Sequence, residues 1–178
     1  EKIENRFNVY LDNIQYDAKF IFEKVGYMLE PSELGSAFGL EQLKKLDDIL
    51  ERRKNSANSH LSFFKKYEDW LELPEMSEKV NSFWFAFPMI VKEAAPFTRT
   101  DLQIFFEKRN IQTRVIFTGN SIRQPAFKNI NKKIDEDGYP VADRVMSRGI
   151  LIACHHGLDN IMLDHIYNSF EKFAEKYS

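Results

Sequence analysis

Residues 82–118, SFWFAFPMIVKEAAPFTRTDLQIFFEKRNIQTRVIFT, decide the fold that we predict for this chain of 178 residues. The alternating run from Ser82 to Lys92 is rich in aromatic and β-branched residues, which predicts a strand. A helix is expected next, because Thr98 and Thr100 can cap its start and a Lys-Arg-Asn stop signal follows it. A second strand is predicted from Ile111 to Thr118. This strand, helix, strand order is typical of an α/β layer domain.

The rest of the chain towards the C-terminus extends the same pattern. The expected segments are, in order, a loop-rich stretch from Gly119 to Gly138, a short helix from Pro140 to Ser147 closed by Gly149, a third strand from Ile150 to Ala153 and a last helix from Leu158. The last helix carries an apolar stripe: Met162, Ile166, Phe170, Phe173 and Tyr177. The predicted fold class is therefore α/β (α+β), with a small three-stranded sheet flanked by helices.

A long helical pattern precedes this domain. It begins after Pro31, and an unbroken helix from Ser32 to Glu68 would be about 55 Å long. A compact protein of this size is only about 40 Å across, so the helix must either break or bridge two bodies. Gly35 and Gly39 lie four residues apart, which permits close approach of a neighbouring helix. We interpret this as a packing face, with a second subunit as a candidate partner.

Composition excludes several function classes. The chain is 43% hydrophobic and 14% aromatic, which supplies ample material for a packed core. With 25 basic and 27 acidic residues it lacks the positive surplus that nucleic-acid binding requires. Its apolar runs are too short to cross a membrane. Cys154 is the single cysteine and no signal peptide opens the chain, so a cytoplasmic protein is expected. Glu1 is not a natural start, which suggests part of a longer protein.

The segment after the second predicted strand has the chemistry of a binding loop. Arg114 and Arg123 offer planar guanidinium groups that suit carboxylate or phosphate, and Asn120 and Gln124 offer amides that suit sugar hydroxyls. All four lie near the glycine turn at Gly119. We therefore expect them to contact substrate. The same residues would equally suit a surface loop with solvated charges, and the sequence leaves both interpretations open.

Two adjacent histidines end the third predicted strand. Side chains alternate along a strand, so His155 and His156 are expected to point to opposite faces, which is a poor arrangement for sharing a metal. No metal site is predicted. Hydrogen bonding or contact with substrate is the expected role of both histidines. Cys154 lies among apolar residues and is interpreted as part of the core.

Several ordered motifs carry a resemblance to a known family. They are Val25-Gly26-Tyr27-Met28-Leu29, Ser32 to Leu43, Ile111-Gln112-Thr113-Arg114, Phe117-Thr118-Gly119-Asn120, Arg123-Gln124-Pro125 and Ala153 to Leu158. Together they resemble the DegT/StrS sugar-nucleotide aminotransferases, which are fold-type I PLP enzymes, and most closely the CDP-4-keto-6-deoxyglucose 3-dehydrase branch. The resemblance implies an aspartate aminotransferase-like fold. Residues 1–30 would end the large PLP-binding domain, 31–79 would form a connecting helix and linker, and 80–178 would form the small C-terminal domain.

The resemblance also implies a function. The full-length enzyme would use PLP or PMP for 3-dehydration or transamination of a nucleotide-linked 4-keto-6-deoxyhexose, in deoxysugar and lipopolysaccharide O-antigen biosynthesis, as a homodimer. Tyr27 and Met28 occupy the family's cofactor-binding Gly-Tyr-Asn motif, whose Asn contacts the PLP phosphate of the partner subunit. Met cannot donate that hydrogen bond.

In the family the residue that anchors the cofactor precedes the segment that Glu1 begins. The chain alone is therefore expected to hold no complete active site and to bind no PLP. A truncated, non-catalytic dimerisation or assembly module is the alternative function.

Overall fold

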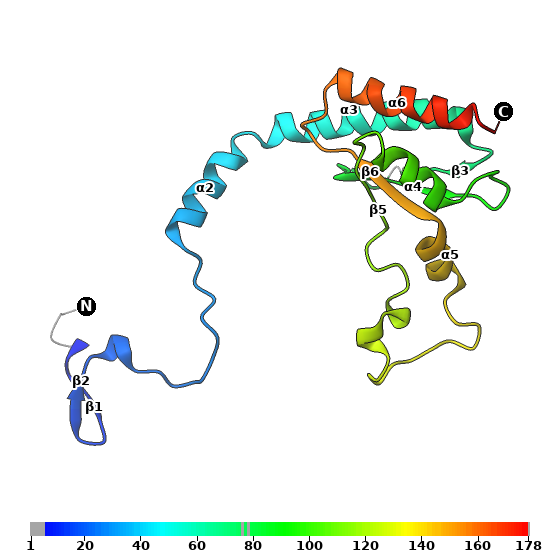
Figure 1. Cartoon of the computed structure of the whole chain (residues 1–178). Helices are drawn as coiled ribbons and strands as arrows, with labels where there is room; N and C mark the ends of the chain where they lie inside the picture. Colours follow the sequence, from blue (N-terminus) through cyan, green and yellow to red (C-terminus); the bar gives the residue numbers. More distant parts are fainter. Residues whose placement is uncertain (1–5, 76, 78, 178) are drawn as a thin grey trace. The chain divides into compact units, whose positions relative to one another are not determined.

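The computed structural model describes residues 6–75, 77 and 79–177, and Figure 1 shows the course of the chain. The chain divides into two compact units, Glu1–Gln42 and Leu43–Ser178. Within the described segments, no helix combines the length and the apolar character needed to cross a membrane.

The first unit contains a small β-hairpin that the sequence analysis did not predict. Strands β1 (Val9–Leu11) and β2 (Ile14–Tyr16) pair antiparallel across Asp12 and Asn13, which both adopt positive φ angles of 47° and 72°. Such a pair of left-handed residues is typical of a two-residue hairpin turn. Strands of three residues are too short to produce a recognisable alternation in sequence.

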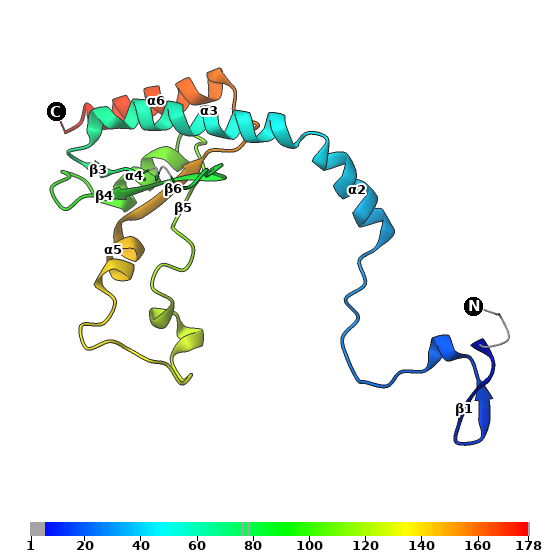
Figure 2. The same cartoon turned by 180° about the vertical axis from the view of Figure 1, so that it is seen from behind.

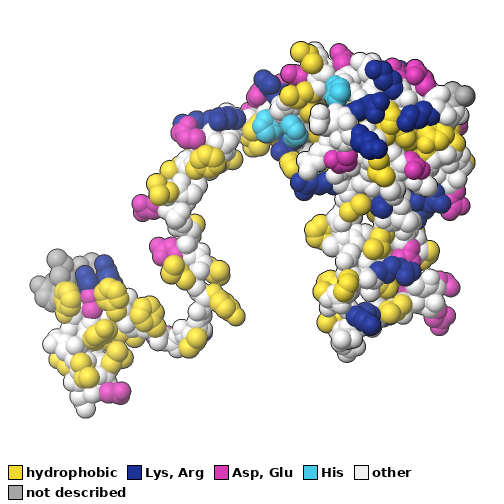
Figure 3. Space-filling view, viewed as in Figure 1, with side chains coloured by type: hydrophobic (Ala, Val, Ile, Leu, Met, Phe, Trp, Pro, Cys, Tyr) yellow, Lys and Arg dark blue, Asp and Glu magenta, His cyan; other side chains and the backbone are white. Residues whose placement is uncertain are grey.

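The remainder of the first unit is a short 3-10 turn, η1 (Ala18–Phe20), followed after an extended stretch by helix α2 (Glu33–Leu43). Asp17 caps η1 by accepting a hydrogen bond from the Lys19 amide, and it also pairs with Arg6. Figure 3 shows apolar side chains exposed over this unit. They include Leu34 and Phe38 on α2, which are 85% and 68% exposed.

The helical pattern from Ser32 to Glu68 was expected either to break or to bridge two bodies, and the structure shows that it breaks. Helix α2 ends at Leu43, and helix α3 (Leu46–Phe64) begins after Lys45, whose φ of −99° and ψ of 0° are not helical. Asp47 and Asp48 lie in the first turn of α3, where the helix dipole favours negative charge. Helix α3 continues into a 3-10 turn, η2 (Lys65–Tyr67).

The second unit is built on a four-stranded antiparallel sheet with the order β3-β4-β6-β5. Its strands are β3 (Leu71–Glu72), β4 (Ala86–Val91), β5 (Thr113–Arg114) and β6 (Gly149–Ala153). The prediction of three strands was therefore wrong. The missed strand, β3, has only two residues, and they pair with Val91 and Ile90 of β4.

The predicted second strand, from Ile111 to Thr118, was also too long. Only Thr113 and Arg114 pair with β6, opposite Ile152 and Leu151. The chain then turns, because Phe117 has a φ of +44° and the Gly119 amide donates to the Ile116 carbonyl at 3.0 Å. Strand β4 likewise begins at Ala86 rather than at Ser82.

One face of this sheet carries the core. Phe87, Met89 and Val91 alternate along β4 as buried residues. Helices α3, α4 (Arg99–Glu107) and α6 (Asn160–Ala174) contribute further large buried side chains: Phe63, Phe64, Leu102, Phe105, Phe106, Ile166, Phe170 and Phe173. Figures 1 and 2, seen from opposite sides, show α3 and α6 lying side by side. The Phe63 and Tyr167 rings stack between them with centroids 4.3 Å apart.

Capping residues determine where the core helices begin. Thr98 accepts a hydrogen bond from the Asp101 amide while the Asp101 carboxylate accepts from the Thr98 amide, which is a complete capping box. Asp159 caps α6 by accepting from the Met162 amide. The predicted short helix is α5 (Pro140–Arg148), closed by Gly149, where β6 begins.

Candidate substrate site

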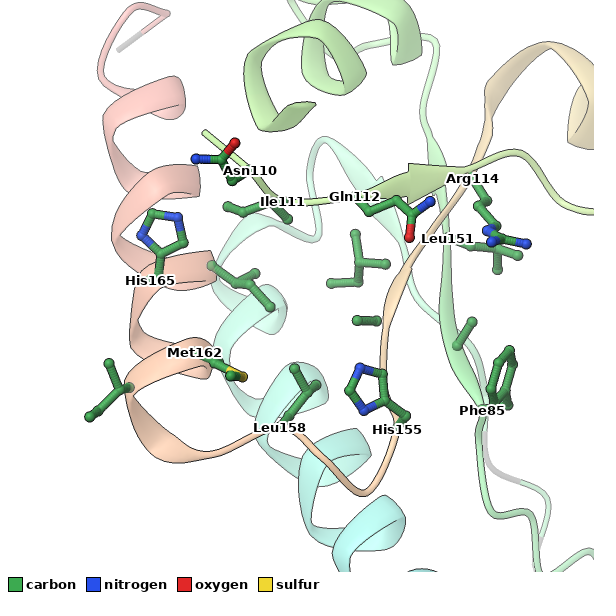
Figure 4. A pocket seen from close by; sticks show the side chains of 15 residues that line it. Phe85, Asn110, Ile111, Gln112, Arg114, Leu151, His155, Leu158, Met162 and His165 are labelled. Atoms are coloured by element: carbon green, nitrogen blue, oxygen red, sulfur yellow. The ribbon is translucent and has the colours of Figure 1, made fainter. Parts of the chain in front are cut away.

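A cavity of the second unit lies at the C-terminal end of β6. It has a volume of about 530 Å³. Figure 4 shows that its lining comes from the end of β6, from the segment before β5 and from the start of α6. The apolar lining includes Phe85, Leu151, Leu158, Ile161 and Met162, and the polar lining consists of Asn110, Gln112, Arg114, His155 and His165. A mainly apolar cavity with a few polar groups is typical of small-molecule sites.

The shortness of β5 creates this cavity. Asn110 adopts a φ of +60°, and the Ile111 amide donates to the Phe106 carbonyl of α4 at 3.0 Å. The chain reaches β6 only at Thr113, whose amide and hydroxyl both donate to Glu107 Oε1, at 2.6 and 2.8 Å. Because residues 110–112 are held to α4, they leave space beside the end of β6.

Two of the predicted substrate residues, Arg114 and His155, line the cavity. Arg114 is exposed, and among the described residues no carboxylate forms a salt bridge with it. His155 Nδ1 accepts a hydrogen bond from the Gly157 amide at 3.1 Å. In the neutral imidazole the proton must then lie on Nε2, which makes Nε2 a donor. The cavity therefore presents a guanidinium and an imidazole N–H beside an apolar wall.

Three other predicted residues lie elsewhere, in the loop that packs on α5. The Asn120 amide donates to Asp143 Oδ1 at 2.8 Å, and Arg123 forms a bidentate pair with the same carboxylate. Gln124 donates to the Thr118 carbonyl at 3.0 Å. Helix α5 leads directly into β6 at Gly149, so this cluster lies near the N-terminal end of the strand, whereas the cavity lies at its C-terminal end. A strand of five residues separates its two ends by roughly 13 Å. The six predicted residues do not form a single site within this unit.

The two histidines do not lie on the third strand, where the sequence analysis expected them. Strand β6 ends at Ala153, so His155 and His156 lie in the turn that follows, where strand alternation does not apply. Their ring centroids are 6.4 Å apart. Only His155 lines the cavity, whereas His156 is exposed. In the part of the chain that the structure describes, no three His, Cys, Asp or Glu side chains gather as a metal site.

Cys154 belongs to the core, as predicted. It is fully buried, its Sγ donates to the Arg53 carbonyl at 3.8 Å, and burial raises the pKa of the thiol to about 11. A thiol with so high a pKa is almost entirely protonated near neutral pH, which makes it a poor nucleophile.

Sequence reasoning missed His60, which bonds to the backbone of Ala153, a residue that lines the cavity. This residue of α3 is fully buried, and its Nε2 bonds to the carbonyl of Ala153 at 2.9 Å. The Tyr167 hydroxyl lies 3.2 Å from Nδ1. Burial lowers the pKa of His60 to about 4, so the neutral ring donates from Nε2 and accepts at Nδ1. Its burial could have been inferred from its spacing, because His60 lies three residues after Ala57 and four residues before Phe64 on the apolar stripe of α3.

The two predicted cofactor-binding residues belong to the first unit. Tyr27 and Met28 are 94% and 90% exposed. The Met28 thioether has no hydrogen to donate to a phosphate. The side chain at this position therefore does not fit the PLP phosphate contact that the resemblance implies.

Comparison with known proteins places these observations in a family. Residues 5–171 match the DegT/DnrJ/EryC1/StrS aminotransferase family. The lipopolysaccharide biosynthesis protein RfbH of Salmonella typhimurium is 34% identical over 89% of this chain and 36% of its own length. The dTDP-4-dehydro-2,6-dideoxy-D-glucose 3-dehydratase of Saccharopolyspora spinosa is 31% identical over 97% of this chain and 37% of its own length.

A solved structure shows the same relationship in three dimensions. The E. coli GDP-4-keto-6-deoxy-D-mannose-3-dehydratase with bound hydrated PLP is 26% identical and superposes with a TM-score of 0.76, over 85% of this chain and 38% of the other. The chain thus spans little more than a third of the length of these relatives. The family match covers nearly all of the chain, and the fold of the chain is part of a PLP-dependent aminotransferase fold. This chain belongs to the DegT/DnrJ/EryC1/StrS aminotransferase family.

Proposed function

We propose that this chain is the C-terminal part of a nucleotide-sugar 3-dehydratase or aminotransferase that acts on a 4-keto-6-deoxyhexose in deoxysugar and lipopolysaccharide biosynthesis. The observation that carries the proposal is the family match over residues 5–171, together with relatives that are named as 3-dehydratases. When bound, PLP or PMP would supply the electron sink for loss of an oxygen substituent or for amino transfer. The proposed enzyme works in the cytoplasm as a homodimer.

In this proposal Arg114 and His155 bind the substrate from the cavity. The guanidinium of Arg114 can donate two parallel hydrogen bonds to an oxyanion, such as a phosphate of the nucleotide. His155 Nε2–H can donate to a neutral acceptor. The apolar wall that includes Phe85, Leu158 and Met162 would exclude water from these bonds and strengthen them.

The test uses the full-length protein that contains this chain. Arg114→Lys keeps the charge and removes the planar fork, so we expect KM for the nucleotide sugar to rise by a factor equivalent to about 1–3 kcal/mol. The matched control is Arg52→Lys, because Arg52 is an exposed arginine of α3 whose ion-pair partner among the described residues is Asp48, one turn away. Unchanged kinetics in Arg114→Lys would remove Arg114 from the substrate site.

The cofactor part of the proposal makes a separate prediction. Met28 does not fit the phosphate, and the chain is proposed to lack the residue that anchors PLP. We therefore expect the purified chain of 178 residues to show no PLP absorbance after dialysis. Stoichiometric PLP that borohydride fixes to one lysine would contradict this expectation.

An assembly module without catalytic activity is the second candidate function. The observation that favours it is the exposed apolar surface on α2, which includes Leu34 and Phe38. Such surface commonly marks an interface. Turnover of a nucleotide sugar by the full-length protein would exclude this alternative.

A further inference from the structure

One carboxylate of α5 holds the loop that carries the predicted sugar-binding side chains. Asp143 Oδ1 accepts from Asn120 Nδ2 at 2.8 Å and also from Arg123 Nε, while Asp143 Oδ2 accepts from Arg123 Nη2 at 2.6 Å. Three donors from two loop residues therefore converge on one side chain. Hydrogen bonds from Arg123 and then from Asn120 lower the pKa of Asp143 to about 2, so it remains a carboxylate over the physiological range.

Further hydrogen bonds and packing hold the same loop in place. Asn120 is 3% exposed, and its Oδ1 accepts from the Ile122 amide, which starts the 3-10 turn η3 (Ser121–Arg123). Both ends of the Asn120 amide are therefore used, one within the loop and one on α5. A β-carbon added to Gly119 would lie only 2.5 Å from the side chain of Met146 on α5, so the backbone packs directly on the helix.

The pairing determines what Arg123 can offer to a ligand. The Asp143 carboxylate accepts the Nε hydrogen and one Nη2 hydrogen of Arg123. Both Nη1 hydrogens and the second Nη2 hydrogen therefore remain available to a ligand. The Arg123 side chain is 60% exposed, so these hydrogens remain accessible. Because its charge is balanced by Asp143, the pair suits neutral acceptors such as sugar hydroxyl or carbonyl oxygens. Arg114, which has no carboxylate partner among the described residues, suits the anionic part of the substrate.

We propose that Asp143 is a positioning residue, which holds the loop of residues 118–124 on α5 and presents Arg123 to the neutral sugar portion of the substrate. This inference rests on the proposed function for the identity of the ligand. The placement of the loop itself depends only on contacts within this chain.

The first experiment measures the loop without any substrate. Amide hydrogen exchange is followed by mass spectrometry over residues 118–124. In this segment the amide of Gly119 donates to the carbonyl of Ile116, just before the loop, and the amides of Arg123 and Gln124 donate to carbonyls within the loop. Asp143→Asn, which keeps the shape but loses the charge, should speed exchange there by about two- to fivefold, the range of an exposed ion pair. The matched control is Asp135→Asn, an exposed carboxylate of the same connecting segment with no side-chain bond among the described contacts. It should leave exchange unchanged.

The second experiment separates positioning from general stability in the full-length enzyme. Asp143→Asn should raise KM by about three- to tenfold with kcat retained, because Arg123 is misplaced while the reacting groups are not. Asp143→Glu, which keeps the charge on a longer stem, should recover part of the loss. It also replaces Asp143→Asn in both experiments if that variant fails to fold.

The outcomes distinguish this inference from the function on which it rests. Unchanged exchange in Asp143→Asn would overturn the placement of the loop. Faster exchange with unchanged KM would overturn the positioning role and leave the proposed function intact. If the wild-type full-length protein turns over no nucleotide sugar, the proposed function fails. In that case the ligand assignment to Arg123 falls with it, while the exchange result still decides the placement of the loop.

Discussion

Acidification is expected to destabilise the second unit through a single buried side chain, His60. Its ring lies against Phe64, Phe87 and Tyr167, with centroids 5.1 to 6.1 Å away, and among the described residues no carboxylate bonds to it. In the neutral form Nε2–H donates to Ala153 and Nδ1 accepts from Tyr167. Protonation would place a positive charge in this aromatic cluster and turn Nδ1 into a donor that faces the Tyr167 hydroxyl.

The magnitude follows from the pKa of the folded and unfolded states. Burial lowers the pKa of His60 from 6.5 to about 4 in the folded state. The unfolded chain therefore binds more protons between these values, and the contribution is complete above about pH 6.5 and is lost as pH falls towards 4. Complete protonation of His60 in the folded state would lower the free energy of unfolding by about 3 kcal/mol. About 2.5 kcal/mol of this decrease occurs between about pH 7.5 and pH 4.5.

The assay is urea unfolding followed by the fluorescence of Trp70 and Trp84, at a series of pH values. Carboxylates also titrate near the acid end, so the informative quantity is the difference in slope between wild type and His60→Gln. We expect the free energy of unfolding of wild type to fall with acidification more steeply than that of His60→Gln, by about 2.5 kcal/mol over this range. His156→Gln removes an exposed imidazole and should keep the wild-type slope. Parallel curves for wild type and His60→Gln would refute the reasoning.

Four further changes test other parts of the structure. Thr98→Ala removes a capping box and should cost about 1 kcal/mol of unfolding free energy in urea titration. Gly119→Ala places a β-carbon against Met146 at a φ of +61° and should cost at least about 1 kcal/mol, visible as a lower Tm. Phe170→Ala empties a fully buried site and should cost about 3–5 kcal/mol. Sedimentation at micromolar concentration should show self-association that Gly39→Leu weakens, and a monomer insensitive to Gly39→Leu would contradict the predicted packing face.

The elements with strong local signals were predicted well. Helix α4 was predicted from Thr98, which caps it, and α5 was predicted to close at Gly149, which it does. Comparing the length of the helical pattern with the size of a compact chain left two outcomes, a break or a bridge between two bodies, and the structure shows the break. These features depend on neighbouring residues, and their physical causes are a capping hydrogen bond, the geometry of a turn and the rise per residue.

The candidate site was predicted less completely, because its residues meet through pairing and packing. Arg114 and His155 lie about forty positions apart in sequence, and the antiparallel pairing of β5 with β6 brings them to one cavity. Asp143 was not predicted to be a site residue, because an acidic residue in the first turn of a helix is common. Its three loop contacts appear only when α5 folds back towards residues 118–124.

The sequence by itself determined the family, the broad α/β class, the apolar stripes of the core helices and the chemical types available for binding. Tertiary structure alone decided the fourth strand, the antiparallel order β3-β4-β6-β5 and the division of the predicted substrate residues into two groups. The physical reason is the distance along the sequence over which each interaction acts. Helix periodicity and capping act over a few residues, whereas strand partners, a buried histidine and a shared carboxylate depend on which distant segments pack together.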